Sequence, residues 1–90
     1  MSFRLRLDGN VVRVFFPRKP LKRWGEDQEG ECHRHKDKSY TVRVLATLPP
    51  RKKRETLIHE LLHASQWSLD EEYVEETARV IEEALNKAGL

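Results

Sequence analysis

A short stretch of the chain places residues that can bind a metal ion next to one that can move a proton. It reads His59-Glu60-Leu61-Leu62-His63, the H-E-x-x-H pattern of zinc-dependent peptidases. Residues four apart lie on one face of an α-helix, so the two imidazoles can hold a single zinc ion from the same side. Glu60 then lies beside the ion, where its carboxylate can take a proton from a water molecule that the ion activates. The pattern predicts metal-assisted hydrolysis with Glu60 as the general base.

A third ligand is expected downstream of His63, because catalytic zinc usually has three protein ligands and an open position. Glu71 and Glu75 lie on the apolar side of the next predicted helix and can face the first one. A simple antiparallel hairpin centred near Leu69 sets Glu75 opposite His63. If the first turn of the second helix folds over the metal instead, Glu71 is the ligand. Periodicity alone leaves both glutamates open.

Size and composition fit one small soluble domain over residues 1–90. Hydrophobic residues make up 38% and charged residues 36% of the chain, so its core is thin and a bound metal would help to stabilise it. No apolar run approaches the length of a membrane span, and the N-terminus has no apolar signal-peptide segment. The single cysteine, Cys32, excludes an internal disulfide. We therefore expect a cytoplasmic protein without a membrane partner.

The net charge of +2 hides two oppositely charged halves. Residues 1–54 carry 15 Lys or Arg and 6 Asp or Glu, a balance of +9, whereas residues 55–90 carry 2 basic and 9 acidic residues, a balance of −7. The halves can attract one another within the monomer, which is the interpretation we favour. The alternative is a basic surface, built from the clusters at 18–23 and 51–54, that binds nucleic acid or an acidic protein.

Alternating apolar and polar residues predict three strands before the zinc helix. Residues 3–7 and 11–16 flank the turn signal Asp8-Gly9-Asn10 and read as a β-hairpin, and residues 40–46 read as a third strand. That third strand enters directly before the predicted zinc helix, a place where a strand can pair with an extended substrate. Residues 17–39, which change from basic to acidic around Trp24-Gly25, are the least regular segment; we expect a loop that either rims a cleft or is mobile.

Two helices complete the predicted fold. The first runs from about Arg51 to Trp67, with a core face of Leu57, Ile58, Leu61, Leu62 and Ser65. The second runs from Glu71 to about Ala88, with Ser68 or Asp70 as its cap, Gly89 as its stop, and an apolar stripe of Val74, Ala78, Ile81 and Leu85. We expect an α+β fold: a three-stranded, mostly antiparallel sheet (the N-terminal hairpin plus one strand) packed on an antiparallel helix pair.

Three further groups suggest roles. The run Arg51-Lys52-Lys53-Arg54 opposes the helix dipole, which indicates pairing with the acidic C-terminal helix or with a partner. Cys32-His33-Arg34-His35 offers three potential metal ligands, but no second half of a structural zinc site accompanies it, so a surface loop with a free thiol is the simpler interpretation. Tyr73 or a histidine of that loop can serve as an oxyanion donor, and Trp67 is most simply a packing residue between the helices.

Residues 30–90 resemble the small, single-domain zinc metallopeptidases of the gluzincin type, which include short proteins of phages and bacteria. The resemblance rests on Thr56-Leu57-Ile58-His59-Glu60-Leu61-Leu62-His63-Ala64-Ser65, Leu69-Asp70-Glu71-Glu72-Tyr73-Val74, Ala78-Arg79-Val80-Ile81 and Leu85. It implies zinc held by His59, His63 and a glutamate of the second helix, with Glu60 as base. In similar sequences the constant acidic residue is the one three before the valine, which selects Glu71.

The expected function is therefore zinc-dependent hydrolysis of peptide bonds in a peptide or protein substrate. The alternative is a catalytically silent binding or regulatory module that zinc stabilises. Such a module can also be associated with nucleic acid. The two differ in what Glu60 does. In a peptidase it takes part in the reaction, whereas in a silent module replacing it leaves every function unchanged.

Overall fold

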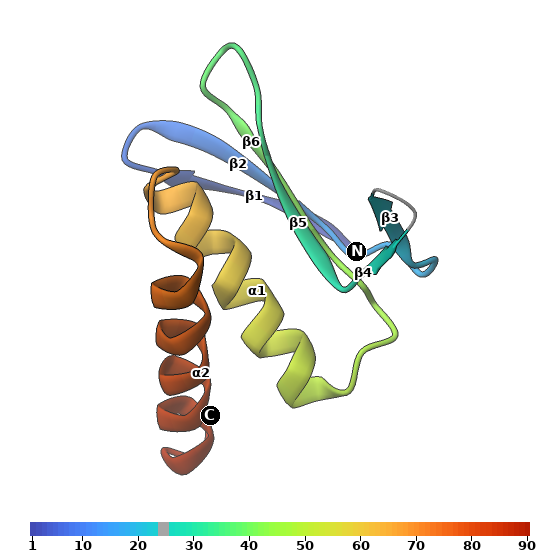
Figure 1. Cartoon of the computed structure of the whole chain (residues 1–90), viewed down its shortest axis with the longest axis vertical. Coiled ribbons are helices and arrows are strands. Elements are labelled where there is room, and N and C mark those ends of the chain that lie inside the picture. The colour runs from blue at the N-terminus through green and yellow to red at the C-terminus, as the bar shows by residue number, and fades with distance from the viewer. Residues whose placement is uncertain (24–25) are drawn as a thin grey trace.

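A computed structural model describes residues 1–23 and 26–90, and in it a mixed sheet carries α1 against one face, with α2 packed on α1 (Figure 1). The main sheet has the strand order β1-β2-β6-β5, and β3 and β4 form a separate two-stranded ribbon. The strands are β1 (Ser2–Leu7), β2 (Asn10–Phe15), β3 (Leu21–Arg23), β4 (Glu26–Gln28), β5 (Gly30–Arg34) and β6 (Tyr40–Val44). The helices are α1 (Pro50–Ser65) and α2 (Glu71–Lys87). The predicted α+β class is correct.

The sheet has one strand more than predicted, because residues 17–39 are not an irregular loop. They contain β3, β4 and β5, and β5 pairs antiparallel with β6 at the edge of the sheet. β6 also pairs in parallel with β2, so it is enclosed on both sides. Periodicity missed β5 because its residues Gly-Glu-Cys-His-Arg lack an apolar alternation, and the backbone of β6 supplies its pairing. The change from basic to acidic residues at Trp24-Gly25 lies outside the described residues.

The N-terminal hairpin is confirmed. Leu7 pairs with Asn10 across a two-residue loop in which Asp8 and Gly9 both have positive φ, 52° and 82°. Such a loop twists in the same sense as the strands it joins, and Asp-Gly is among the pairs that adopt it most readily. The predicted turn therefore fixes the register of β1 on β2.

The core lies between the sheet and α1. Val12 and Val14 of β2 face the same way as Val42 and Val44 of β6, and all four are fully buried. Leu57 and Leu61 of α1 pack against this cluster, as does Ala64. Because side chains alternate along a strand, the intervening residues of β2 and β6 point to the opposite face of the sheet.

The most buried stripe of α1 is not the one that its leucines predict. It consists of Thr56, Glu60 and Ala64, while the predicted core residue Ser65 is exposed. The reason is a close approach to β5: a Cβ added at Gly30 would lie 2.6 Å from Thr56 Cγ2 and 3.1 Å from Glu60 Oε2. A glycine there lets the strand and the helix come together and so buries Glu60.

α2 begins and ends where predicted. Asp70 caps it by accepting a hydrogen bond from the Tyr73 backbone N–H at 3.2 Å, and Gly89 (φ 79°) follows its last turn. Val74 and Ala78 are buried against α1, but the predicted Ile81 is exposed and Glu82 is buried in its place. Within the described ranges neither helix is both long and apolar enough to cross a membrane.

Glu82 is buried because two arginines of α1 reach it. Arg51 Nε lies 2.6 Å from Glu82 Oε1, and Arg54 Nη1 lies 3.5 Å from Oε2 without forming a hydrogen bond to it. The predicted pairing of the 51–54 cluster with the acidic C-terminal helix is therefore confirmed for its two arginines. These contacts cross-link the first turn of α1 to the C-terminal half of α2.

Candidate metal centre

The two histidines of the H-E-x-x-H pattern lie together on α1, as the helical spacing requires. The centroids of the His59 and His63 rings are 5.0 Å apart, and the rings are inclined by 63°. Both side chains are largely buried, 21% and 16% exposed. Their Nε2 atoms point toward the start of α2, because both contact the same carboxylate there.

That carboxylate belongs to Glu71, the first residue of α2. Its Oε1 lies 2.8 Å from His59 Nε2 and its Oε2 lies 2.9 Å from His63 Nε2. The Asp70 cap immediately before it fixes where the helix starts and so fixes the position of Glu71. Of the two glutamates left open by periodicity, Glu71 joins the histidines, whereas Glu75 lines the adjacent cleft outside this group.

The donor set fits a zinc ion. One atom each from His59, His63 and Glu71 lie within 4.8 Å of one another, and in the described part of the chain this is the one such group of three possible ligands. Two imidazole nitrogens with one carboxylate oxygen are a usual set for catalytic zinc. The same group opens onto a cleft, so a fourth position remains accessible.

Glu60 lies on the buried side of the centre, 8% exposed. Burial raises the pKa of its carboxyl from 4.5 to about 7, and the negative charges of Glu71 and Glu31 add to the effect. Among the described residues no cation forms an ion pair with Glu60. A carboxyl whose pKa is close to neutral can both accept and return a proton, which is the property of a general acid–base.

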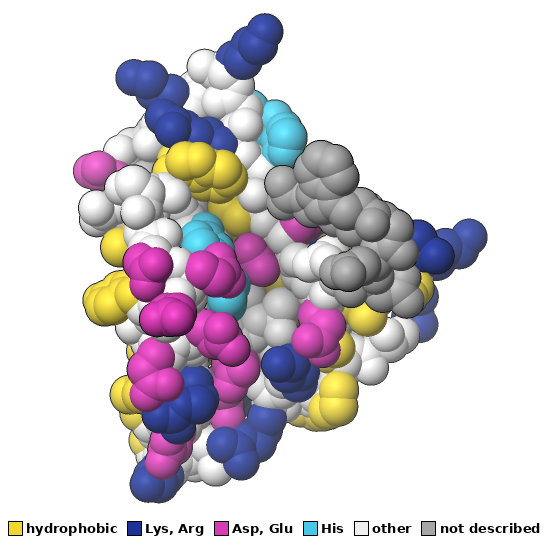
Figure 2. All heavy atoms as spheres, viewed as in Figure 1, with side chains coloured by type: hydrophobic (Ala, Val, Ile, Leu, Met, Phe, Trp, Pro, Cys, Tyr) yellow, Lys and Arg dark blue, Asp and Glu magenta, His cyan; other side chains and the backbone are white. Residues whose placement is uncertain are grey.

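The centre opens onto a cleft of about 600 Å³ between β5, α1 and the start of α2. Acidic side chains surround the histidines on the face of the molecule that carries the helices (Figure 2). Besides Glu60 and Glu71, the described residues of the lining include four more carboxylates and one cation: Glu29, Glu31, Glu55, Glu75 and Lys52. Lys52 lies 3.7 Å from both Glu29 and Glu55, and Glu31 pairs with Arg43 at 2.9 Å. The cleft is therefore strongly acidic.

The strand beside this cleft is β5, not the predicted residues 40–46. β6 is paired on both sides and has no free edge, so the prediction that it pairs with substrate is wrong. β5 is the last strand of the sheet, so one of its edges is unpaired among the described strands, and Gly30, Glu31 and Cys32 line the cleft. Sequence reasoning missed Gly30 as a site residue. The signal that could have indicated it is a glycine that stands directly before the possible metal ligands Cys32, His33 and His35.

The surface loop preferred for Cys32-His33-Arg34-His35 is wrong, and the alternative metal cluster is not among the groups of three possible ligands that the described residues bring together. Cys32, His33, Arg34 and His35 are in or next to β5 rather than in a surface loop, and alternation sends Cys32 to the face opposite His33. His33 and His35 stack edge to face at 4.8 Å, and His35 Nε2 lies 2.7 Å from Thr41 Oγ1. Cys32 faces the cleft, where burial, helped by the charge of Glu60, raises the pKa of its thiol to about 12.

Two aromatic predictions also change. Trp67 does not pack between the helices; it lies in the link between them, 44% exposed, lines the cleft, and has its ring centroid 6.0 Å from that of Tyr40. Tyr73, predicted as an oxyanion donor, is exposed and does not line the cleft. His33 and His35, the other predicted donors, do not line it either.

Comparison with protein-family models, curated proteins and solved structures finds no significant match for this chain.

Proposed function

We propose that this protein is a zinc-dependent metallopeptidase of the gluzincin type. The observation that carries the proposal is the convergence of His59, His63 and Glu71 from two different helices, with both Nε2 atoms within 2.9 Å of one carboxylate. Sequence spacing brings the two histidines together, but only the fold brings Glu71 to them. An exposed glutamate gains little from lying between two imidazoles in water, whereas three such donors hold a divalent ion well.

In the proposed reaction each residue has a separate task. His59, His63 and Glu71 hold the ion, which when bound supplies a Lewis acid for the scissile carbonyl and for the attacking water. Glu60 takes the proton from that water and delivers it to the amine that leaves. Its buried position, away from any paired cation in the described residues, keeps the carboxyl available for both transfers.

We propose that the substrate backbone binds along the edge of β5 that is unpaired among the described strands. An extended peptide can add to a free strand edge through main-chain hydrogen bonds, and this edge borders the cleft that contains the histidines. The substrate is then held alongside Gly30 and Glu31 with its scissile bond toward Glu60. A peptide or unfolded protein segment fits this arrangement because only an extended chain presents unpaired backbone groups.

The test combines metal analysis with hydrolysis of an unfolded protein such as casein. We expect one zinc per chain in the wild type and in Glu60→Gln, but activity at least 100-fold lower in the variant because a general base contributes about 10²–10⁴. Glu71→Ala and His63→Ala should lose zinc. Glu75→Ala is the matched control, since it removes a cleft carboxylate one turn along the same helix and should keep the metal.

The same experiment separates the proposal from its alternative, a catalytically silent module stabilised by zinc. That protein would bind zinc through the same residues and would melt at a lower temperature in a chelator. Glu60→Gln would change none of its functions. Absence of zinc binding in the wild type would refute both readings.

A further inference from the structure

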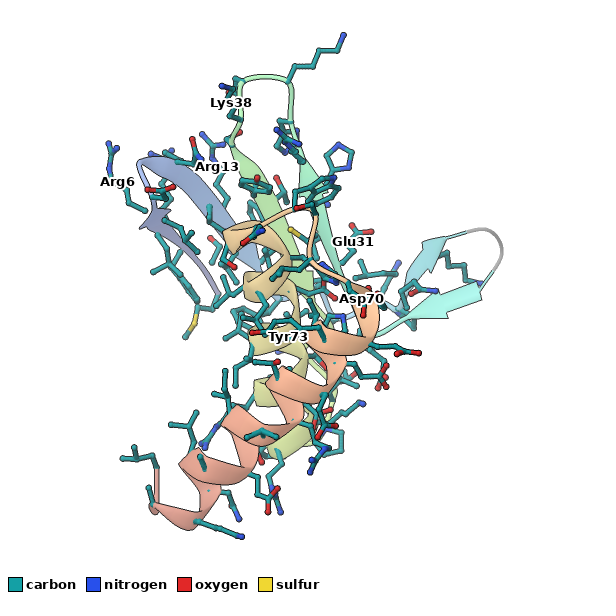
Figure 3. All side chains as sticks on the ribbon, turned by 60° about the vertical axis from the view of Figure 1, so that its left-hand side comes forward. Arg6, Arg13, Glu31, Lys38, Asp70 and Tyr73 are labelled. Carbon is teal, nitrogen blue, oxygen red and sulfur yellow. The ribbon has the colours of Figure 1, made fainter. Side chains whose placement is uncertain are left out.

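The face of the sheet opposite α1 carries three arginines that are cross-strand neighbours on β1 and β2. Arg4 of β1 is directly opposite Arg13 of β2, and Arg6, two residues along β1, is diagonal to Arg13. Like charges directly across a strand pair destabilise a sheet, so this arrangement is unfavourable by itself. Figure 3 shows Arg6 and Arg13 near one another on β1 and β2, toward the end of the sheet where Lys38 lies.

No carboxylate offsets Arg4 or Arg6 within the described residues, where neither forms an ion pair. Arg13 acts on Asp37, whose pKa is lowered mainly by the hydrogen bonds that it accepts from Ser39, and only last by Arg13. Asp37 is exposed and already engaged, so it neutralises little of the group. The contrast with Arg51 and Arg54, which converge on a buried glutamate, suggests that these arginines are placed for a partner outside the chain.

The same face carries an exposed aromatic ring. Phe15 follows Arg13 by two residues on β2 and is 38% exposed. The Arg43 guanidinium, which pairs with Glu31 at 2.9 Å, lies over the Phe15 ring at 5.9 Å from its centroid. Beside it lies a hollow of about 500 Å³ lined by Met1, Ser2, Phe15, Phe16, Pro17 and Arg43. A flat ring next to a guanidinium plane is a surface on which a nucleic-acid base stacks.

We propose that this open sheet face, defined by Arg4, Arg6, Arg13, Phe15 and Arg43, binds single-stranded nucleic acid. The three arginines of β1 and β2 contact consecutive phosphates, and one base stacks on Phe15 at the mouth of the hollow. A duplex keeps its bases stacked inside, so Phe15 and the hollow would find no ligand there. This site lies on other residues than the basic clusters at 18–23 and 51–54 that the sequence suggested. In the second of these clusters, Arg51 and Arg54 are paired with Glu82.

The test is fluorescence anisotropy with a labelled 12-nucleotide dT or rU strand, using the full chain. Three phosphate contacts on a single strand predict an affinity that falls about 20-fold between 50 and 200 mM NaCl. Arg4→Gln with Arg13→Gln leaves one contact and should reduce that fall to about threefold, with much weaker binding at 50 mM. Phe15→Leu keeps apolar packing but removes the flat ring, and should weaken binding by about fivefold or more.

The matched control is Arg79→Gln with Lys87→Gln on α2, which removes the same two charges at a distance from the open sheet face. It should leave binding unchanged. Equal loss in this control would mean that net charge alone attracts the strand and would overturn the proposal. So would equal binding of a duplex without any effect of Phe15→Leu, equal competition by polyglutamate, or self-association of the chain that the Arg4 and Arg13 substitutions abolish. Circular dichroism of each variant verifies that the fold is retained.

Discussion

Two glutamates on facing helices are buried to a similar degree but in opposite electrostatic surroundings. Glu82 of α2 is 2% exposed and lies against Arg51 and Arg54. Glu60 of α1 is 8% exposed, and its pKa is raised by burial and by the negative charges of Glu71 and Glu31. Both positions desolvate a carboxylate, yet among the residues that the structure describes only Glu82 has counterions that offset that cost.

If the proposed function is correct, the difference in electrostatic surroundings separates a structural role for Glu82 from a chemical role for Glu60. A small domain with a thin core gains little from burying a carboxylate among other carboxylates, because the charged form loses hydration without gaining a partner. Such a group is retained where reactivity requires it, and functional sites are where strongly shifted pKa values concentrate. Glu82 stabilises the helix pair, whereas Glu60 is held in an unfavourable place beside the cleft.

The largest effect on stability should come from removing the cations of Glu82. In Arg51→Ala with Arg54→Ala, the buried carboxylate of Glu82 loses both partners. We expect the free energy of unfolding to fall by roughly 3 kcal/mol. This value is at the low end for a broken buried ion pair because the shortened side chains admit water. Urea denaturation followed by circular dichroism measures this. Lys52→Ala with Lys53→Ala is the control, as it removes equal charge from the same turn but only solvent-exposed pairs of Lys52 at 3.7 Å. Equal losses in both double variants would show that Glu82 is not the reason.

The reactivity of the Cys32 thiol depends on Glu60, because the charge of Glu60 helps to raise the pKa of that thiol. With a pKa of about 12, its thiolate is about 1 in 10,000 of the population at pH 8, against roughly a quarter for an ordinary thiol. Alkylation by iodoacetamide should therefore be about a thousand-fold slower in the folded protein than in 6 M guanidinium, and should accelerate as the pH rises above 10. Glu60→Gln removes one cause of the shift and should increase the rate at pH 8. Reaction of the folded wild type as fast as the unfolded chain would contradict this account.

Gly30 is the contact that buries Glu60, so it can be used to disturb that glutamate without changing it. In Gly30→Ala the added Cβ meets Thr56 Cγ2 at 2.6 Å and the Arg43 carbonyl oxygen at 3.2 Å. We expect a loss of about 1–3 kcal/mol in the free energy of unfolding, as for other overpacked sites, together with reduced activity. Adding Thr56→Ser removes the clashing methyl group and should restore most of the loss. Without that rescue, the close approach of β5 to α1 is not the cause.

Much of this architecture is readable from local pattern. The turn at Asp8-Gly9, the cap at Asp70 and the stop at Gly89 each depend on a residue and its immediate neighbours, so their chemistry is present in the sequence. The pairing of His59 with His63 is equally local, because helical spacing alone places them on one face.

What could not be read depends on contacts between distant segments. β5 has no apolar alternation of its own, and its pairing is supplied by the side of β6 that β2 leaves unoccupied. The burial of Glu60 follows from that strand through Gly30, and the burial of Glu82 follows from two arginines 31 and 28 positions earlier in the chain. From sequence alone, a glutamate at a position of the apolar stripe predicts a helix boundary or a solvent-exposed face. Its burial can be predicted only when the cations that pair with it are known.

The smallest predicted effect is also the most direct comparison, because Glu60→Gln and Glu82→Gln make the same chemical change at the two buried positions. In Glu82→Gln the arginines lose an acceptor but, at 64% and 38% exposure, they can turn to water, so we expect a loss of only about 1 kcal/mol. Glu60→Gln replaces a carboxylate that forms no ion pair within residues 1–23 and 26–90 by a neutral group of the same shape. Its free energy of unfolding in chelator at pH 7.5 should equal or exceed that of the wild type. Urea titrations of both variants in EDTA decide the matter: if Glu60→Gln is destabilised as much as Glu82→Gln, then Glu60 supports the fold just as Glu82 does, and its burial is no sign of catalysis.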